Sequence, residues 1–196
     1  MPTTFTNQAT LSYNNQSIPS NVVTGVLTEV LSVSKTAIPA AYQNGNTITY
    51  AVQLVNSGTA ALTGLTLTDN LGAYTPAAGT AAVVPMTYQS DTLRYYRNGI
   101  LQATPTIAAT SPLTVTGLSI PAGGNTTLMY AVKTNQFTPY GAEESVTNTA
   151  TVTGGGLAAP LTAEATVNAD PAPDLSVIKS MCPTTVTFGG TVDAKK

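Results

Sequence analysis

TITYAVQLV, residues Thr47 to Val55, alternates apolar side chains with small or polar ones along its whole length. This period of two is typical of a β-strand with one buried face. The positions expected to face inward are Ile48, Tyr50, Val52 and Leu54. Threonine occupies much of the opposite face, where a β-branched polar side chain suits a pleated, solvated surface. The segment therefore predicts a half-buried antiparallel strand.

The same period recurs in LTGLTLTD (62–69), TLMYAVK (127–133) and SVTNTATV (145–152). Turn signals separate these runs: Asn44-Gly45, Asn56-Ser57-Gly58, Asn98-Gly99, Gly123-Gly124 and Gly154-Gly155-Gly156. Asn98-Gly99, between LRYYR and ILQ, is the strongest hairpin signal, because both residues tolerate a positive φ. Short strands at this spacing predict an all-β, antiparallel β-sandwich.

The chain also repeats itself. LSVSKTAIPAAYQNGNTI (31–48) returns as LSVIKSMCPTTVTFGGTV (175–192), and NQATLS from Asn7 resembles NTATVT from Asn148. We therefore expect one whole sandwich module at 30–170. Residues 1–29 are expected to form a hairpin that either packs on the sandwich or belongs to a preceding unit. Residues 171–196 are expected to be a linker and the truncated first strand of the next repeat. Such arrays usually build surfaces and spacers.

Composition excludes several classes of function. The net charge is −2 and only 8% of residues are charged, whereas nucleic-acid binding needs a concentrated basic surface. The chain has no histidine and one cysteine, Cys182, so the commonest general base and the usual zinc ligands are missing. We expect no enzyme activity, no cofactor and no metal. No apolar run is long enough to insert into a membrane, and the N-terminal residues show no secretory signal.

The order LSVSKT…GNTITYAVQLVNSGTAALTGLTLTDNL…SIPAGGNTTLMYAV…VTNTATVTG resembles the tandem repeat domain of unknown function number eleven, found in bacterial and archaeal surface proteins. The resemblance runs from about Leu31 to Asn168 and resumes at Asp174. It implies an immunoglobulin-like β-sandwich that serves as a stalk or wall-associated module, outside the cell and without enzyme activity.

Strand parity predicts one reactive constellation. Lys35 is in phase with Leu31 and Val33, Asp69 with Leu65 and Leu67, and Asn148 with Val146, Ala150 and Val152. An ammonium, a carboxyl and a carboxamide are thus expected to face the apolar interior, where each is costly unless paired. We predict that Lys35 and Asn148 could form an isopeptide cross-link assisted by Asp69. The alternative is that they lie at strand ends, where Lys35 reaches water and Asp69 caps a turn.

The segment LRYYRNG offers a second candidate site. Arg94, Tyr95, Tyr96 and Arg97 lie on the predicted hairpin and could contact a glycan or a protein ligand. The alternative is ordinary strand alternation, with one tyrosine in the core and the other covering an edge.

These observations favour a structural spacer module of a bacterial cell-surface or wall-associated protein. The alternative is an adhesion module that binds glycan or protein through exposed hairpin loops. The expected partners are neighbouring repeat modules of the same protein. Strand-mediated self-association is also open, because the two flanking fragments have unpaired edges.

Overall fold

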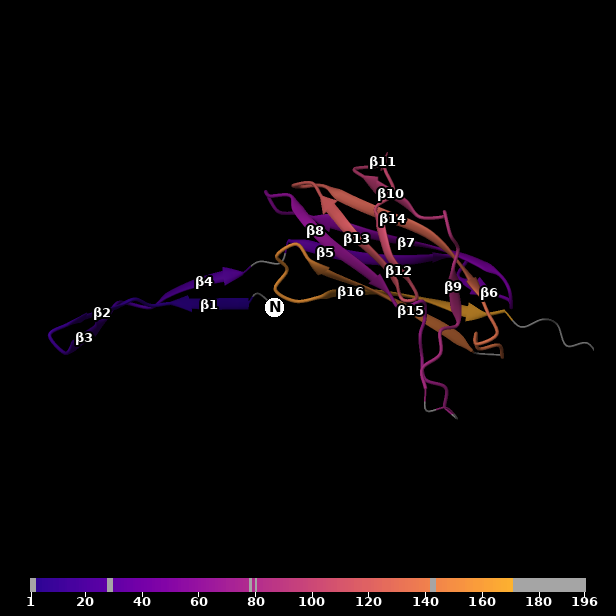
Figure 1. The fold of residues 1–196 in the computed structure, drawn as a ribbon, viewed down its shortest axis with the longest axis horizontal. Helices are drawn as coiled ribbons and strands as arrows, with labels where there is room; N and C mark the ends of the chain where they lie inside the picture. Colours follow the sequence, from indigo (N-terminus) through magenta and orange to yellow (C-terminus); the bar gives the residue numbers. More distant parts are fainter. Residues whose placement is uncertain (1–2, 28–29, 78, 80, 142–143, 171–196) are drawn as a thin grey trace, which may run out of the picture.

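The computed structural model of the chain describes residues 3–27, 30–77, 79, 81–141 and 144–170 (Figure 1). Every regular element in these ranges is a β-strand. The predicted linker and strand at 171–196 lie outside the described residues. Within the described ranges, no helix has the length and apolar character needed to cross a membrane.

Two six-stranded sheets form the body of the molecule. The first contains β5 (Leu31–Ile38), β7 (Thr47–Asn56), β9 (Met86–Tyr88), β10 (Arg94–Arg97), β11 (Ile100–Gln102) and β14 (Asn125–Thr134). Its order is β11-β10-β14-β7-β5, with β9 also paired to β14. The second contains β6 (Ala41–Tyr42), β8 (Leu62–Asp69), β12 (Thr106–Thr110), β13 (Leu113–Ile120), β15 (Ser145–Gly154) and β16 (Leu161–Ala169), in the order β12-β13-β8-β15-β16-β6.

The sheets pack face to face, and the prediction of an all-β antiparallel sandwich is confirmed (Figure 1). Among the described strand pairs, β16 with β6 is the one parallel pair. The predicted inward face of β7 is the centre of the core: Ile48, Tyr50, Val52 and Leu54 are fully buried. Largely apolar inner faces from both sheets supply the hydrophobic free energy that holds the layers together.

The predicted hairpin at Asn98-Gly99 is present between β10 and β11. Asn98 has φ 47° and Gly99 has φ 76°, which are the left-handed values that a two-residue hairpin turn requires. The turn brings Arg97 opposite Ile100, so the tip of this hairpin stays at the edge of the first sheet.

The N-terminal hairpin is a long two-stranded ribbon. β1 (Thr3–Asn7) pairs with β4 (Val23–Leu27), and β2 (Thr10–Tyr13) pairs with β3 (Gln16–Pro19). Figure 1 shows the ribbon extending away from one end of the sandwich. Its described side chains are almost all exposed, because a two-stranded ribbon has no second layer against which to bury a face.

Candidate functional site

Lys35, Asp69 and Asn148, which strand alternation predicted to face inward, all lie in the core. Asp69 and Asn148 are fully buried, and Lys35 is 7% exposed. Each interrupts an otherwise apolar inner face, on β5, β8 and β15 respectively. Contrary to the alternative interpretation, Lys35 does not reach water, because its side chain is fully enclosed. Asp69, at the end of β8, does cap the following turn, as that alternative also expected.

Strand order explains why these residues meet. Lys35 lies on β5, the strand at one edge of the first sheet. In the second sheet, β8 and β15 are neighbours, and Asp69 pairs with Ala150. Asn148 is two residues before Ala150 and shares its inner face, so it lies diagonally next to Asp69. The ammonium is thus supplied by one layer, and the carboxylate and the carboxamide by the other.

Asp69 is the centre of this cluster. Its Oδ2 accepts hydrogen bonds from Lys35 Nζ and from the hydroxyl of Tyr130 on β14. Its Oδ1 accepts the backbone N–H of Leu71 at 2.9 Å. Both carboxylate oxygens are therefore occupied by donors, which offsets the cost of removing the charge from water.

Lys35 is held in a setting that favours its neutral amine. Burial lowers the pKa of the Lys35 ammonium from 10.5 to about 8, and the attraction of Asp69 opposes this shift only in part. The Nζ atom also lies 4.6 Å from the centre of the Tyr50 ring, within the range of a cation–π contact. A neutral amine is a nucleophile, whereas an ammonium is not.

Two tyrosines complete the enclosure. Tyr50 on β7 pairs directly with Tyr130 on β14, and their ring centroids are 6.0 Å apart. Burial raises the pKa of Tyr130 well above 10, and the nearby Asp69 carboxylate raises it further. Burial also raises the pKa of Tyr50, with the Asn148 carboxamide acting in the opposite direction. Both phenols therefore stay protonated and act as hydrogen-bond donors.

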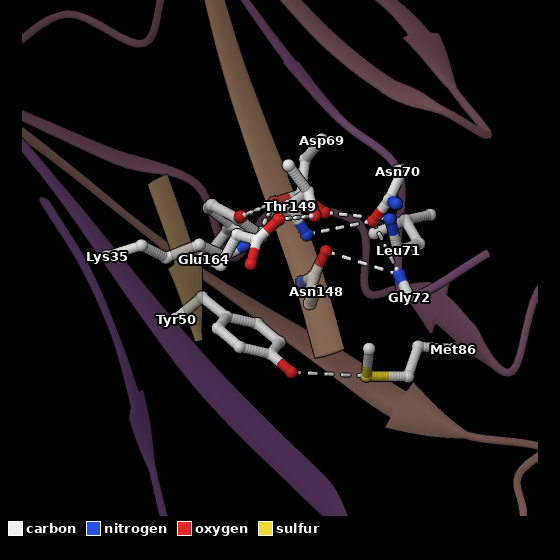
Figure 2. Close-up of polar contacts among 11 residues, drawn as sticks. Lys35, Tyr50, Asp69, Asn70, Leu71, Gly72, Met86, Asn148, Thr149 and Glu164 are labelled. Carbon is white, nitrogen blue, oxygen red and sulfur yellow. Dashed lines mark hydrogen bonds and ion pairs between the residues drawn. The ribbon is translucent and has the colours of Figure 1, made fainter. Parts of the chain in front are cut away.

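The Asn148 carboxamide has a defined orientation. Its Oδ1 accepts the backbone N–H of Gly72 at 3.2 Å, as Figure 2 shows. Because an amide nitrogen cannot accept such a bond, this contact directs the oxygen toward Gly72 and the nitrogen away from it. The Nδ2 atom is buried and finds no hydrogen-bond partner among the described residues. The carbonyl is thus polarised by a donor.

A tight turn after β8 carries the Gly72 donor. Asn70 fastens this turn to β15, because its Oδ1 accepts both the N–H of Gly72 at 2.9 Å and the N–H of Thr149 at 3.0 Å (Figure 2). Its own backbone N–H donates to Thr149 O at 3.0 Å. The donor to the Asn148 carbonyl is therefore positioned by contacts with the residue adjacent to Asn148.

Gly72 is required at this turn for two physical reasons. Its φ is +73°, a conformation that side chains of L-residues rarely adopt. A Cβ at this position would also lie 2.4 Å from Val146 Cγ1. The turn can pack this closely against Val146 of β15 because glycine carries no side chain.

Sequence reasoning did not identify Tyr50, Tyr130, Asn70 or Gly72 as parts of the site. Tyr50 and Tyr130 were placed on inner faces by alternation, and a phenol facing the interior is itself a polar group in need of a partner. Asn70 and Gly72 lie in a turn, where periodicity carries no information on direction.

The predicted cross-link would be a condensation between Lys35 and Asn148. Transfer of a proton from Lys35 to Asp69 leaves a neutral amine beside a neutral acid. This transfer costs less free energy in a buried site than in water, because it removes two charges from a medium that solvates them poorly. The amine can then attack Cγ of Asn148, and the N–H of Gly72 is placed to stabilise negative charge on Oδ1. Asp69 is the group able to move protons between the entering and leaving nitrogens.

The second predicted site has a different character. Tyr95 is buried at 6% exposure, and its hydroxyl donates to Ser119 O at 2.9 Å. Tyr96 is half-buried, and Arg97 Nη2 donates to Gln102 Oε1 at 2.6 Å. Arg94 is exposed, with Nη1 bonded to the backbone oxygen of Asp91 at 2.9 Å. The structure thus leaves Arg94 and part of Tyr96 accessible, and ligand contact at this hairpin stays a prediction.

Among the described residues, no group of three His, Cys, Asp or Glu side chains is arranged to hold a metal ion. The polar cluster in the core contains a single carboxylate, Asp69, and its oxygens already accept hydrogen bonds.

No family model matches the chain, and no curated protein sequence matches it. The resemblance to the tandem repeat domain therefore stays a prediction. Solved structures share the fold. A variant of BcpA, the major pilin subunit of Bacillus cereus, matches with a TM-score of 0.51 at 10% identity, over 97% of this chain and 60% of that chain.

Two further matches come from streptococci. The N-terminal domain of the Streptococcus gordonii adhesin Sgo0707 has a TM-score of 0.51 at 15% identity, over 70% of this chain and 32% of that chain. The pilus backbone protein RrgB of Streptococcus pneumoniae has a TM-score of 0.49 at 10% identity, over 63% of this chain and 31% of that chain. This chain thus spans about a third of the streptococcal chains, and identities this low establish the fold alone.

Proposed function

We propose that this chain is a structural module of a bacterial cell-surface protein, and that its sandwich is locked by an isopeptide bond between Lys35 and Asn148. The observation that carries the proposal is the buried cluster of Lys35, Asp69 and Asn148, together with the Gly72 donor on the Asn148 carbonyl. The likeness to pilin and adhesin folds is consistent with a location outside the cell.

The reaction balances without any external reagent. Lys35 Nζ forms a bond to Cγ of Asn148, and the bond from Cγ to Nδ2 breaks. The ammonium of Lys35 gives up two protons: one leaves with Nδ2 as ammonia, and the other remains on Asp69. The products are a secondary amide, ammonia and a neutral carboxylic acid. Because two buried charges become neutral groups, the product is easier to accommodate in the core than the ion pair.

The position of the bond suits a load-bearing module. Lys35 lies on the first strand of the sandwich and Asn148 on β15, the strand before the last. A bond between them joins the two sheets and closes a loop of roughly a hundred residues, for which chain-entropy estimates give about 4.7 kcal/mol by analogy with a disulfide. A force applied along the chain would then have to break a covalent bond before the sheets could separate.

Intact mass in denaturant tests the proposal. The wild-type chain is expected to be lighter than its sequence mass by one molecule of ammonia, and digestion is expected to release a branched peptide that contains both Lys35 and Asn148. Lys35→Arg and Asn148→Ala should each restore the full mass. Lys133→Ala and Asn168→Ala, which alter exposed residues of the same types, should keep the deficit. A wild-type chain at full mass would refute the cross-link.

The alternative is that this chain is an adhesion module of a cell-surface protein. It would use Arg94 and the accessible part of Tyr96, beside the exposed side chains of Ile100 and Leu101 on β11. The core cluster would then serve stability alone, and a saturable ligand would be expected at this hairpin.

A further inference from the structure

The N-terminal ribbon carries a row of apolar side chains in solvent. Phe5 is 59% exposed and Leu11 is 68% exposed. Asn7 and Ala9 lie between them at alternate positions of the sequence and are also exposed. A two-stranded ribbon is marginally stable alone, and a row of large apolar groups on it indicates a surface that is covered in use.

This row matches the buried face of β15. When NQATLS is placed on NTATVT, Asn7 falls on Asn148 and Ala9 falls on Ala150, with identical residues at both positions. Phe5 then falls on Val146 and Leu11 on Val152, so apolar residues replace apolar residues. In the sandwich all of these positions of β15 are buried. The ribbon thus exposes a face whose counterpart in β15 forms part of the core.

The ribbon also has the strand direction of the closing hairpin of the sandwich. β1 and β4 are antiparallel, as β15 and β16 are, and the asparagine is paired in both: Asn7, the last residue of β1, lies opposite Val23, and Asn148, within β15, lies opposite Ala165.

Asn7 lies in a groove on the ribbon that Phe5, Ala9, Val23 and Gly25 also line. The Phe5 ring lies across Gly25, since a Cβ at Gly25 would be 2.4 Å from the ring. The carboxamide is therefore presented on the same face as the exposed apolar row.

We propose that residues 3–27 close a second sandwich of the same architecture, and that Asn7 is the acceptor of its lysine cross-link. The exposed face would be covered by a preceding repeat that lacks its own last two strands, so that the ribbon supplies them. That repeat would carry a lysine on its first strand, at the position equivalent to Lys35. A second copy of this chain fits less well, because β15 and β16 already fill that place in its sandwich. The covalent part rests on the proposed function of the Lys35–Asn148 pair, whereas the docking part does not.

The bond would form as in the complete module. The amine of the incoming lysine joins Cγ of Asn7, the Asn7 amide nitrogen leaves as ammonia, and a carboxylate equivalent to Asp69 carries the protons. No oxidant or co-reactant is needed, and each bond formed accounts for one ammonia lost.

A tandem chain tests the proposal, with residues 31–143 joined ahead of Thr3 of the full chain. It carries Phe5→Val, because the space around Val146 is already tight: a Cβ on Gly72 would lie 2.4 Å from Val146 Cγ1. The expected result is a mass deficit of two ammonia molecules in denaturant. Hydrogen exchange of the ribbon amides is expected to be slowed at least tenfold relative to the unextended chain with the same Phe5→Val change.

Matched variants separate the two cross-links. In the tandem chain, Asn7→Ala should leave one ammonia lost and keep the ribbon protected, and Asn148→Ala should remove the other deficit alone. Thr6→Ala lies on the opposite face of β1 and should change neither readout.

The outcomes are distinct. A ribbon that exchanges equally fast in the tandem and the unextended chain overturns the proposal, even if one ammonia is lost. A protected ribbon with one ammonia lost, and none lost in the Asn148→Ala tandem chain, supports docking and refutes Asn7 as an acceptor. A protected ribbon with no ammonia lost refutes the cross-link at both places, including the proposed function, while docking stands. Dimerisation of the unextended chain with a protected ribbon assigns the face to a second copy and overturns the proposal.

Discussion

Lys35 on β5 and Asp69 at the end of β8 form an ion pair that is enclosed between the two sheets, with both side chains fully removed from solvent. A pair of this kind adds little stability by itself, because the cost of desolvating two charges cancels much of their attraction. Its surroundings suit the proposed second role, because the ammonium and the carboxylate share a proton beside an amide whose oxygen already accepts a hydrogen bond from a backbone N–H.

Removal of the Asp69 carboxylate is expected to abolish cross-linking and weaken the fold. Asp69→Asn retains the shape of the side chain but leaves the buried Lys35 without a counter-charge, and breaking such a pair costs about 3–5 kcal/mol. The variant should show the full sequence mass and a lower midpoint in thermal unfolding. An Asp69→Asn chain that still loses ammonia would show that the carboxylate is dispensable for the reaction.

Tyr130→Phe removes one of the two donors to Asp69 Oδ2. Hydrogen bonds to charged groups contribute about 1.5–3 kcal/mol, so a decrease of this size is expected in the free energy of unfolding measured with denaturant. The comparison is made in an Asn148→Ala background, where no cross-link can form. Tyr95→Phe, which loses a hydroxyl bonded to Ser119 outside the cluster, provides a matched reference. An unchanged free energy for Tyr130→Phe would argue against this hydrogen bond.

Asn70→Ala is expected to slow cross-linking while the sandwich still folds. The change removes the acceptor that fixes the amides of Gly72 and Thr149, and hydrogen bonds of this kind contribute about 1 kcal/mol each. Loss of this positioning should reduce the rate roughly 5- to 30-fold, as followed by mass after refolding of chains kept unfolded since synthesis. Asn70→Asp retains an acceptor oxygen and should recover most of the rate. Equal rates for Asn70→Ala and wild type would remove the positioning role.

The rate of cross-linking should change little with pH near neutrality and fall as the pH rises through about 8, the lowered pKa of Lys35. The reason is that the reacting pair of neutral amine and neutral acid holds the same number of protons as the ion pair, and loss of that shared proton removes the acid that carries protons to the leaving nitrogen. Refolding into buffers between pH 6 and pH 9, with mass read at timed intervals, checks the profile. A rate that keeps rising above pH 8 would show that the neutral amine reacts without the acid.

The same lowered pKa predicts the pH dependence of stability in the Asn148→Ala chain. Between about 8 and 10.5 the unfolded state binds more protons at Lys35 than the folded state does, so the free energy of unfolding should increase with pH across this window. Lys35→Met in the same background should lose this dependence. Denaturant unfolding at several pH values distinguishes the two chains. If the free energy of unfolding rises with pH as steeply in the Lys35→Met variant as in the Asn148→Ala chain, the effect belongs to another group.

The hairpin from Arg94 to Arg97 separates the structural role from the adhesive alternative. A spacer should show no saturable glycan ligand on an array, and Tyr96→Ala should leave the cross-link intact. Binding that Tyr96→Ala abolishes, with the mass deficit unchanged, would instead establish an adhesion module.

The sequence alone determined which side chains face inward. Alternation along each strand has a period of two, so Lys35, Asp69 and Asn148 had to share a face with leucine, valine and alanine, and the Asn98-Gly99 turn followed from local φ preferences. Which of these inward groups meet was decided by tertiary structure. Strand order places Tyr130 over Asp69, and a turn with no periodicity brings the Gly72 amide to Asn148. Parity is a property of one strand, whereas contact between layers depends on how distant strands are ordered and registered.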